Sequence, residues 1–261
     1  MRVTLYLGRD TVLYRLHPQV KLGLLAATFA SIYGVDRPVA VAPVATALAL
    51  LLVSARAFVN VRRFAVMFIA VPLATFVMWS LFYGYGQGGA AALGARPRGE
   101  AIEFAAGMAL KLESFLAASV LFLSITRVEE FTEALRDLGM PYRMSFTIAL
   151  AFRLVPLFLA SALSVVVAQR ARGLDFSRGN VFARLARYVP VIVPVFMGAL
   201  RRADAMAMAL EARGFSRQAA RTTFLRSRFS ARDIIVATVI VCVVVIYVWA
   251  SVHGYGRLRG R

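Results

Sequence analysis

The sequence has few cysteines, histidines and acidic residues, and each shortage excludes a class of site. Its one cysteine, Cys242, excludes an intrachain disulfide and a metal site built from cysteines. Its two histidines, His17 and His253, lie near opposite ends of the chain without paired carboxylates, so we predict neither a metal site nor a catalytic site. The phosphate-binding pattern Gly-x-x-x-x-Gly-Lys-Ser/Thr is also absent, so the chain is not itself an ATPase of that class.

Negative charge is scarce, with 13 acidic residues against 31 basic ones and a net charge of +18. All the basic residues except Lys21 and Lys111 are arginines, whose planar guanidinium stays charged and pairs bidentately with carboxylates. Because the arginines lie between apolar runs, they indicate loops that face anionic lipid, and we expect no nucleic-acid partner. The basic residues placed just before the last apolar run are Arg217, Arg221, Arg226, Arg228 and Arg232.

Hydrophobic residues make up 60% of the chain, against about 45–50% in soluble domains, and the mean hydropathy is +0.71. A soluble fold of this length could not bury that much apolar surface, so lipid must cover part of it. Five apolar runs predict five transmembrane helices, although the first two are short for a span of ~20 residues. The runs are residues 20–33, 39–53, 64–83, 101–125 and 234–250.

Three clusters of basic residues indicate the orientation, and they lie at 1–21, at 56–63 and throughout 126–232. With four spans in 1–125, all three clusters face one compartment, which the positive-inside rule identifies as the cytoplasm. The basic tail after the fifth run then lies outside and disagrees with that rule.

The region 126–232 contains two further apolar runs, at 146–168 and 189–200. Arg153 lies inside the first run, and an arginine at mid-membrane costs about 2.5–3.5 kcal/mol or more. The second run is too short to span the bilayer and contains two prolines. We therefore expect two long helices that lie against the membrane face and pack on each other. The alternative is that the first run is a sixth span whose arginine faces a partner helix.

Each of these two segments ends in the same tripeptide, at Ala171-Arg172-Gly173 and at Ala212-Arg213-Gly214. Glycine after a helix C-terminus forms a left-handed cap, and an arginine there favours the negative end of the helix dipole. That explanation accounts for each copy singly. Two copies after two comparable segments predict arginines that enter two equivalent acidic pockets, as on a dimeric partner.

Several sequence blocks, taken in order, give the chain a specific family resemblance. They are residues 16–22 (Leu-His-Pro-Gln-Val-Lys-Leu), 126–130 (Thr-Arg-Val-Glu-Glu), 134–135 (Ala-Leu), 138–141 (Leu-Gly-Met-Pro), 153–156 (Arg-Leu-Val-Pro), 201–204 (Arg-Arg-Ala-Asp) and 211–215 (Glu-Ala-Arg-Gly-Phe). With the two Ala-Arg-Gly motifs they cover nearly the whole chain. The sequence resembles the transmembrane T component, of CbiQ/EcfT type, of energy-coupling-factor (ECF) ABC transporters.

The resemblance implies that the chain joins two cytoplasmic ABC-type ATPases to a small membrane subunit that binds the substrate, a vitamin or a transition-metal ion (cobalt or nickel). The ATPases would bind ATP, so this chain would need no cofactor and would not be an enzyme. It would be a multi-pass protein of the bacterial cytoplasmic membrane. Arg172 and Arg213 would dock in the ATPases, and the residues that shape the two tips would be Ala171, Gly173, Ala212 and Gly214.

The predicted fold class is an all-α integral membrane protein with about five transmembrane helices and a cytoplasmic coupling module of long crossed helices. The expected parts are transmembrane helices one to four in 1–125, the coupling module in 126–232, and the last transmembrane helix and tail in 233–261. Prolines remove backbone hydrogen bonds and bend helices, or are merely tolerated beside lipid. The candidate bends in the coupling helices are Pro156, Pro190 and Pro194.

Two other function classes stay open. A secondary transporter would need repeated spans and intramembrane ionisable residues, which Lys111 and Glu113 alone do not supply. A membrane-embedded lipid-modifying enzyme would need an acid-base or metal constellation at the interface, and none is visible. The acidic residues at 129–137 are either a coupling element or, as such runs usually are, a solvated face. The residues that form either an internal salt-bridge set or a partner contact are Arg201, Arg202, Asp204 and Glu211.

Overall fold

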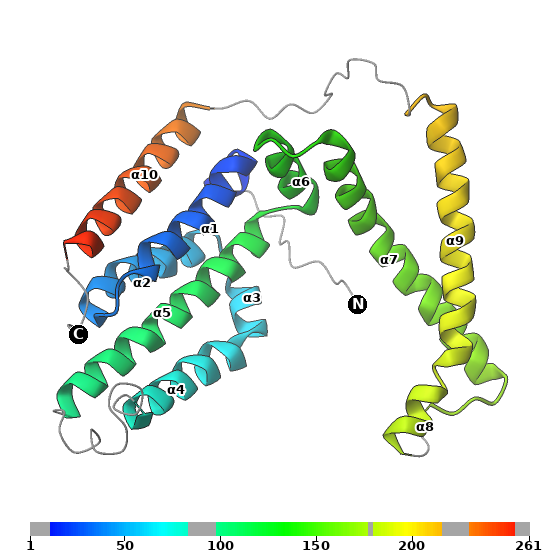
Figure 1. The fold of residues 1–261 in the computed structure, drawn as a ribbon, viewed down its shortest axis with the longest axis horizontal. Helices are drawn as coiled ribbons and strands as arrows, with labels where there is room; N and C mark the ends of the chain where they lie inside the picture. The colour runs from blue at the N-terminus through cyan, green and yellow to red at the C-terminus, as the bar shows by residue number, and fades with distance from the viewer. Residues whose placement is uncertain (1–10, 83–97, 177–179, 216–229, 254–261) are drawn as a thin grey trace. The chain divides into compact units, whose positions relative to one another are not determined.

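The computed structural model describes residues 11–82, 98–176, 180–215 and 230–253, and every regular element in those ranges is a helix (Figure 1). The helices are η1 (Val12–Arg15, a 3-10 turn), α1 (Pro18–Tyr33), α2 (Pro38–Ser54), α3 (Phe58–Arg63), α4 (Ala65–Phe82), α5 (Arg98–Ile125), α6 (Val128–Asp137), α7 (Tyr142–Ala171), α8 (Val181–Ala186), α9 (Val189–Ala212) and α10 (Ala231–Val252). The predicted all-α class is confirmed, and the five apolar runs correspond to α1, α2, α4, α5 and α10.

Prolines begin several of these helices. Pro18, Pro38 and Pro190 lie in the first turn of α1, α2 and α9, where the missing N–H would have no partner in any case. Pro190 therefore lies at the start of its helix, whereas Pro156 and Pro194 lie inside α7 and α9. Of the three candidate bends, Pro156 and Pro194 therefore occupy positions where a proline removes a hydrogen bond within the helix.

The chain divides into two compact units, one formed by Met1–Met140 with Ser227–Arg261 and the other by Pro141–Arg226. α6 packs against α1 and belongs to the first unit, while the predicted functional division at residues 126 and 232 stays a prediction. The second unit contains α7, α8 and α9 and so includes both Ala-Arg-Gly motifs.

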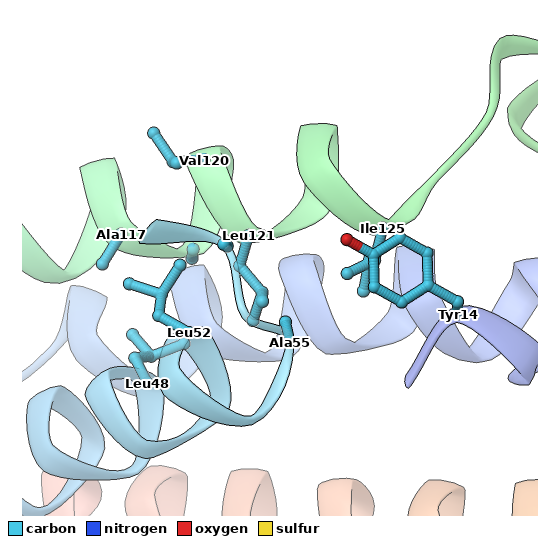
Figure 2. Close-up of a cluster of buried hydrophobic side chains, with 10 residues drawn as sticks. Tyr14, Leu48, Leu52, Ala55, Ala117, Val120, Leu121 and Ile125 are labelled. Carbon is cyan, nitrogen blue, oxygen red and sulfur yellow. The ribbon is translucent and has the colours of Figure 1, made fainter. Parts of the chain in front are cut away.

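The core of the first unit lies between η1, α2 and α5. Figure 2 shows Leu48 and Leu52 of α2 facing Leu121 of α5, with the ring of Tyr14 beside Ile125 at the end of α5. Buried alanines occupy many of the remaining core positions, and small side chains allow the backbones of apolar helices to approach closely. These buried alanines are Ala55, Ala57, Ala117 and Ala118. α4 packs on the side of α5, and α10 packs on α1.

Four helices are long and apolar enough to cross a membrane, judged by length and composition in the described residues: α4, α5, α7 and α10. α2 is a shorter apolar helix, and α1 has 16 residues, as the short first two runs predict. α7 meets the same criteria although Arg153 interrupts it, whereas α9 does not.

The second unit is built on an antiparallel pair. Nε2 of Gln169, near the end of α7, donates to the carbonyl of Pro190 at the start of α9 (3.4 Å). Phe215, which follows α9, packs on Phe146 and Tyr142 in the first turns of α7, with ring centroids 4.5 and 6.1 Å apart. The end of each long helix therefore lies beside the start of the other.

Candidate functional site

The first Ala-Arg-Gly motif closes α7 with a complete Schellman turn. Arg172 is the C-cap residue, and Gly173 follows it with φ of +87°. The N–H of Gly173 donates to the carbonyl of Arg170 (2.9 Å), and the N–H of Leu174 donates to the carbonyl of Gln169 (3.1 Å). These two bonds satisfy helix-end carbonyls that would otherwise lack partners, and the left-handed φ favours glycine.

The second motif closes α9 with the same turn. Arg213 is the C-cap residue, and Gly214 has φ of +74°. Gly214 donates to the carbonyl of Glu211 and Phe215 to the carbonyl of Leu210, both at 2.9 Å. Position by position, the two tips therefore present an arginine in the same backbone setting.

The Schellman turn alone does not explain the two arginines, because α6 ends in the same turn and has a leucine at the C-cap position. Leu138 is its C-cap residue, and Gly139 has φ of +104°. Gly139 donates to the carbonyl of Arg136 (3.0 Å), and Met140 donates to the carbonyl of Leu135 (3.1 Å). Glycine is what this helix ending requires, so the arginine at the other two ends calls for a separate explanation.

Both tip arginines are exposed, and no ion pair involves either of them within the part of the chain that the structure describes. Across the same residues, no salt bridge joins the acidic and basic side chains of α9 that the sequence suggested as an internal set: Arg201, Arg202, Asp204 and Glu211. An exposed guanidinium held at a rigid turn is suited to a charge-assisted contact with a carboxylate of another protein.

Neighbouring side chains hold the backbone around the first tip. Nη1 of Arg187 donates to the carbonyl of Asp175 (2.7 Å). Phe176 packs on Tyr188 with centroids 5.1 Å apart, and the guanidinium of Arg170 lies 5.8 Å from the Phe176 ring centroid. Arg170, Asp175 and Phe176 also line a pocket beside Gly173. The first tip is thus braced against the two residues that join α8 to α9.

The antiparallel packing places the two tips at opposite ends of the second unit. α9 has 24 residues, so its ends are about 36 Å apart at 1.5 Å per residue. Arg172 lies near the start of α9 and Arg213 at its end. A single pocket cannot hold both arginines.

A second polar site, which the sequence analysis did not predict, joins the helices of the first unit. Lys21 of α1 is buried, and its Nζ donates to the carbonyl of Tyr14 (2.8 Å), the carbonyl of Ile125 (3.0 Å) and Oε2 of Glu130 (2.6 Å). An ammonium group has three donors, and all three are used here. The same site includes Asp233 of α10, whose carboxylate accepts from the backbone N–H of His17 (2.9 Å) and of Ser230 (2.8 Å).

Lys111, the other lysine, also binds backbone carbonyls between helices, at the opposite end of α1. Its Nζ donates to the carbonyl of Tyr33 (2.8 Å) and more weakly to the carbonyl of Val35 and to Oδ1 of Asp36, both at 3.4 Å. A cation at a helix C-terminus satisfies its last carbonyls and favours its dipole. Lys111 therefore has a structural role. The signal that could have identified both sites is the rarity of lysine, since each lysine begins or interrupts an apolar run.

The basic residues expected to meet lipid before the last span lie mainly outside the described residues. Four of them lie outside the described residues: Arg217, Arg221, Arg226 and Arg228. The fifth, Arg232, is exposed in the first turn of α10. The described residues contain no group of three or more His, Cys, Asp or Glu side chains that could hold a metal ion.

The family model CbiQ, described as "Cobalt transport protein", matches residues 9–224 and so spans both helix tips and Lys21 with its three acceptors. The chain belongs to the CbiQ family. Several proteins similar to this chain bear the name energy-coupling factor transporter transmembrane protein EcfT. The resemblance predicted from the sequence blocks is therefore confirmed: the chain belongs to this family and is similar to proteins named as transmembrane proteins of ECF transporters.

Three relatives illustrate the similarity. EcfT of Limosilactobacillus fermentum is 35% identical over 126 residues, which cover 48% of this CbiQ-family chain and 47% of that protein. EcfT of Ruminiclostridium cellulolyticum is 30% identical over 164 residues, 60% of each chain. EcfT of Brevibacillus brevis is 30% identical over 145 residues, 55% of each chain. The chain spans about half the length of the curated relatives it matches.

The family and the apolar helices together establish a multi-pass protein of the bacterial cytoplasmic membrane. Relatives named as transporter membrane subunits also confirm the prediction that this CbiQ-family chain is not an enzyme. The roles of the tip arginines, their neighbours and the three prolines stay predictions.

Proposed function

We propose that this chain is the coupling subunit of an ECF-type ABC importer. It would transmit ATP binding and hydrolysis in two cytoplasmic ATPases to a small membrane subunit that binds the substrate. The observation that carries the proposal is the pair of identical arginine-tipped turns at opposite ends of one antiparallel helix pair. Two equivalent tips that cannot share a pocket suit two equivalent copies of a partner.

The position of α7 follows from how the chain leaves and re-enters the first unit. The hydrogen bonds of Lys21 to Ile125 and of His17 to Asp233 place the end of α5 and the start of α10 at the same end of α1. The segment between them therefore crosses the membrane an even number of times or not at all. α9 is not a candidate span, so a crossing by α7 alone would leave α10 starting on the wrong side. These bonds support a second unit that stays on the cytoplasmic side.

The relay would work through rigid helices. ATP binding would draw the two ATPases together, and their grooves would move the tips at Arg172 and Arg213. Because each tip ends a long helix, its displacement changes the angle between α7 and α9. Pro156 and Pro194, inside these helices, are the places where each would bend along the membrane surface.

The transported substrate would be a vitamin or a transition-metal ion such as cobalt or nickel. The family description "Cobalt transport protein" supports the metal ion, and a separate membrane subunit would select the substrate. Purification of the native complex through a tag on this chain, followed by identification of the co-purifying membrane subunit, would name the substrate class.

The docking role is tested by the double variant Arg172→Glu/Arg213→Glu. A desolvated arginine–carboxylate pair broken on one side costs about 2–5 kcal/mol at an interface, so we expect loss of stable ATPase association and of transport. Membrane insertion should be unchanged, because both side chains are exposed. The measurement is the amount of ATPase that co-purifies with the tagged chain from membranes.

The matched control is Arg153→Glu/Arg201→Glu, which makes the same charge change at two exposed arginines in the middle of α7 and α9, away from both tips. It should bind ATPase as the unmodified chain does. Full ATPase binding by the tip variant would show that the arginines do not dock there. Equal loss in both variants would mean that the overall charge, rather than the two tips, holds the complex together.

A further inference from the structure

We infer that the ion pair between Lys21 and Glu130 is the rigid joint through which movement of the second unit enters the transmembrane bundle. The inference rests on the proposed function and adds to it a positioning site outside the two helix tips. Its basis is a juxtaposition: a fully buried ammonium of α1 meets a carboxylate of α6, the helix that directly precedes α7 in the chain.

The bundle side of the joint is fixed. The Lys21 side chain has no exposed surface, and two of its three donors bind the carbonyls of Tyr14 and Ile125 within the first unit. The ammonium therefore joins the chain before α1 to the end of α5. Hydrogen bonds in a buried, low-dielectric setting are stronger than the same bonds in water, so the ammonium is held in one place.

The other side of the joint is α6. The third donor of Lys21 binds Oε2 of Glu130 at 2.6 Å, in the first turn of α6. Phe131 adds an edge-to-face contact with Phe122 of α5, centroids 6.1 Å apart, and Thr132 and Ala134 are buried. This ion pair joins α6 to α1.

The covalent path from α6 to the first tip is short. Residues 138–141 form the Schellman turn at Gly139 and lead directly into α7, which ends at Arg172. A displacement of α7 therefore acts on α6 through the four residues 138–141. The first three of these belong to the hydrogen-bonded turn that ends α6. Whether α1 follows depends on how firmly α6 is held to it, and Lys21 with Glu130 supplies the charged bond between them.

The joint is tested by distance measurement between two nitroxide labels in the complete complex with its ATPases. One label is placed on the native Cys242 of α10, which is exposed, and the other on Glu129→Cys, an exposed position of α6. With the ion pair intact, we expect one narrow distance that is the same without nucleotide and with ATP and vanadate. In Glu130→Gln, which keeps the shape and loses the charge, the distance should broaden and shift with nucleotide.

Asp137→Asn is the matched control, because it removes the same charge from α6 while its ion-pair partner, Arg136, lies on α6 itself. It should keep the narrow distance. An unchanged distance in Glu130→Gln would overturn the inference, and so would a Glu130→Gln chain that no longer assembles with ATPases while Asp137→Asn does. Failure of the unmodified chain to hold ATPases would instead overturn the proposed function, which co-purification scores separately.

Discussion

At the scale of single residues, the chain uses its two kinds of basic side chain for different purposes. Both lysines are buried, and each donates to backbone carbonyls at the end of a helix. None of the arginines whose side chains the structure describes is buried. A compact ammonium with three donors fits a small ring of carbonyls, whereas the planar fork of arginine is larger and always charged. Lysine therefore fastens the bundle, whereas the described arginines lie outside the core.

Gly107 and Lys111 of α5 both contact the turn between α1 and α2. A Cβ at Gly107 would clash with the carbonyl oxygen of Asp36, and Lys111, one helical turn later, binds the carbonyl of Tyr33. We predict that Gly107→Ala forces the turn away from α5 and costs about 1–3 kcal/mol, as overpacking does. A lower thermal unfolding midpoint of the purified protein would measure this.

Gly23→Ala is the control for that substitution, because a Cβ at Gly23 of α1 meets nothing within 4 Å. Alanine in a helix interior is favoured over glycine by about 0.5–1 kcal/mol, so the midpoint should stay or rise. Equal midpoints for the two variants would show that the close approach at Gly107 does not constrain the fold.

At the scale of whole helices, α7 and α9 are joined at both ends of their antiparallel pair. Gln169 contacts Pro190 at one end, and Phe215 packs on Phe146 at the other. Phe215 belongs to the second tip, so the tip that would dock in an ATPase is also the contact that closes this end of the pair. A change in the angle between the helices must therefore alter the contact between Phe215 and Phe146.

A reducible thiol cross-linker between Phe146→Cys and Phe215→Cys, in a Cys242→Ala background, should hold that angle. We predict that the cross-linked complex keeps its ATPases and substrate subunit but loses ATP-driven uptake, and that reduction restores uptake. Uptake into proteoliposomes, before and after reduction, is the measurement.

The matched control places both cysteines on α7, at Phe146 and Leu150, one helical turn apart on one face. Cross-linking within one helix leaves the angle free, so uptake should continue. Full uptake by the chain cross-linked between α7 and α9 would show that their angle does not transmit the work.

At the scale of the whole molecule, the side of the membrane on which each segment lies is the central question. The starts of α1 and α10 lie together, and the hydroxyl of Tyr247 near the end of α10 donates to the carbonyl of Ala40 at the start of α2 (2.9 Å). α1 and α10 are therefore parallel, which agrees with an odd number of spans and an outer C-terminus.

Cysteine labelling in a Cys242→Ala background tests this topology at three exposed arginines. An impermeant maleimide added to intact cells should label Arg37→Cys, in the turn between α1 and α2. Arg62→Cys and Arg184→Cys should react only after the membrane is opened, because both lie in segments predicted to be cytoplasmic. Labelling of Arg184→Cys from outside intact cells would place the second unit across the membrane and overturn the arrangement.

The sequence alone was enough to predict the helical class, the apolar helices and the helix endings at the tips. These features depend on local chemistry: apolar runs form helices in lipid, proline begins a helix, and glycine ends one. The repeated Ala-Arg-Gly motif predicted two helix ends for the same reason, since a Schellman turn involves only residues next to one another in the chain. The order of the sequence blocks was enough to recognise the family, which the match over residues 9–224 confirms.

Only the tertiary structure decided which distant residues meet. Lys21 and Glu130 are 109 positions apart, and His17 and Asp233 are 216 apart, so no local pattern joins them. The packing of α6 in the first unit and the antiparallel order of α7 and α9 depend likewise on contacts between helices far apart in sequence. Apolar helices pack through many weak, interchangeable contacts, so their side chains alone do not specify neighbours. The few buried polar pairs distinguish one arrangement from another, and they form only once the helices are in place.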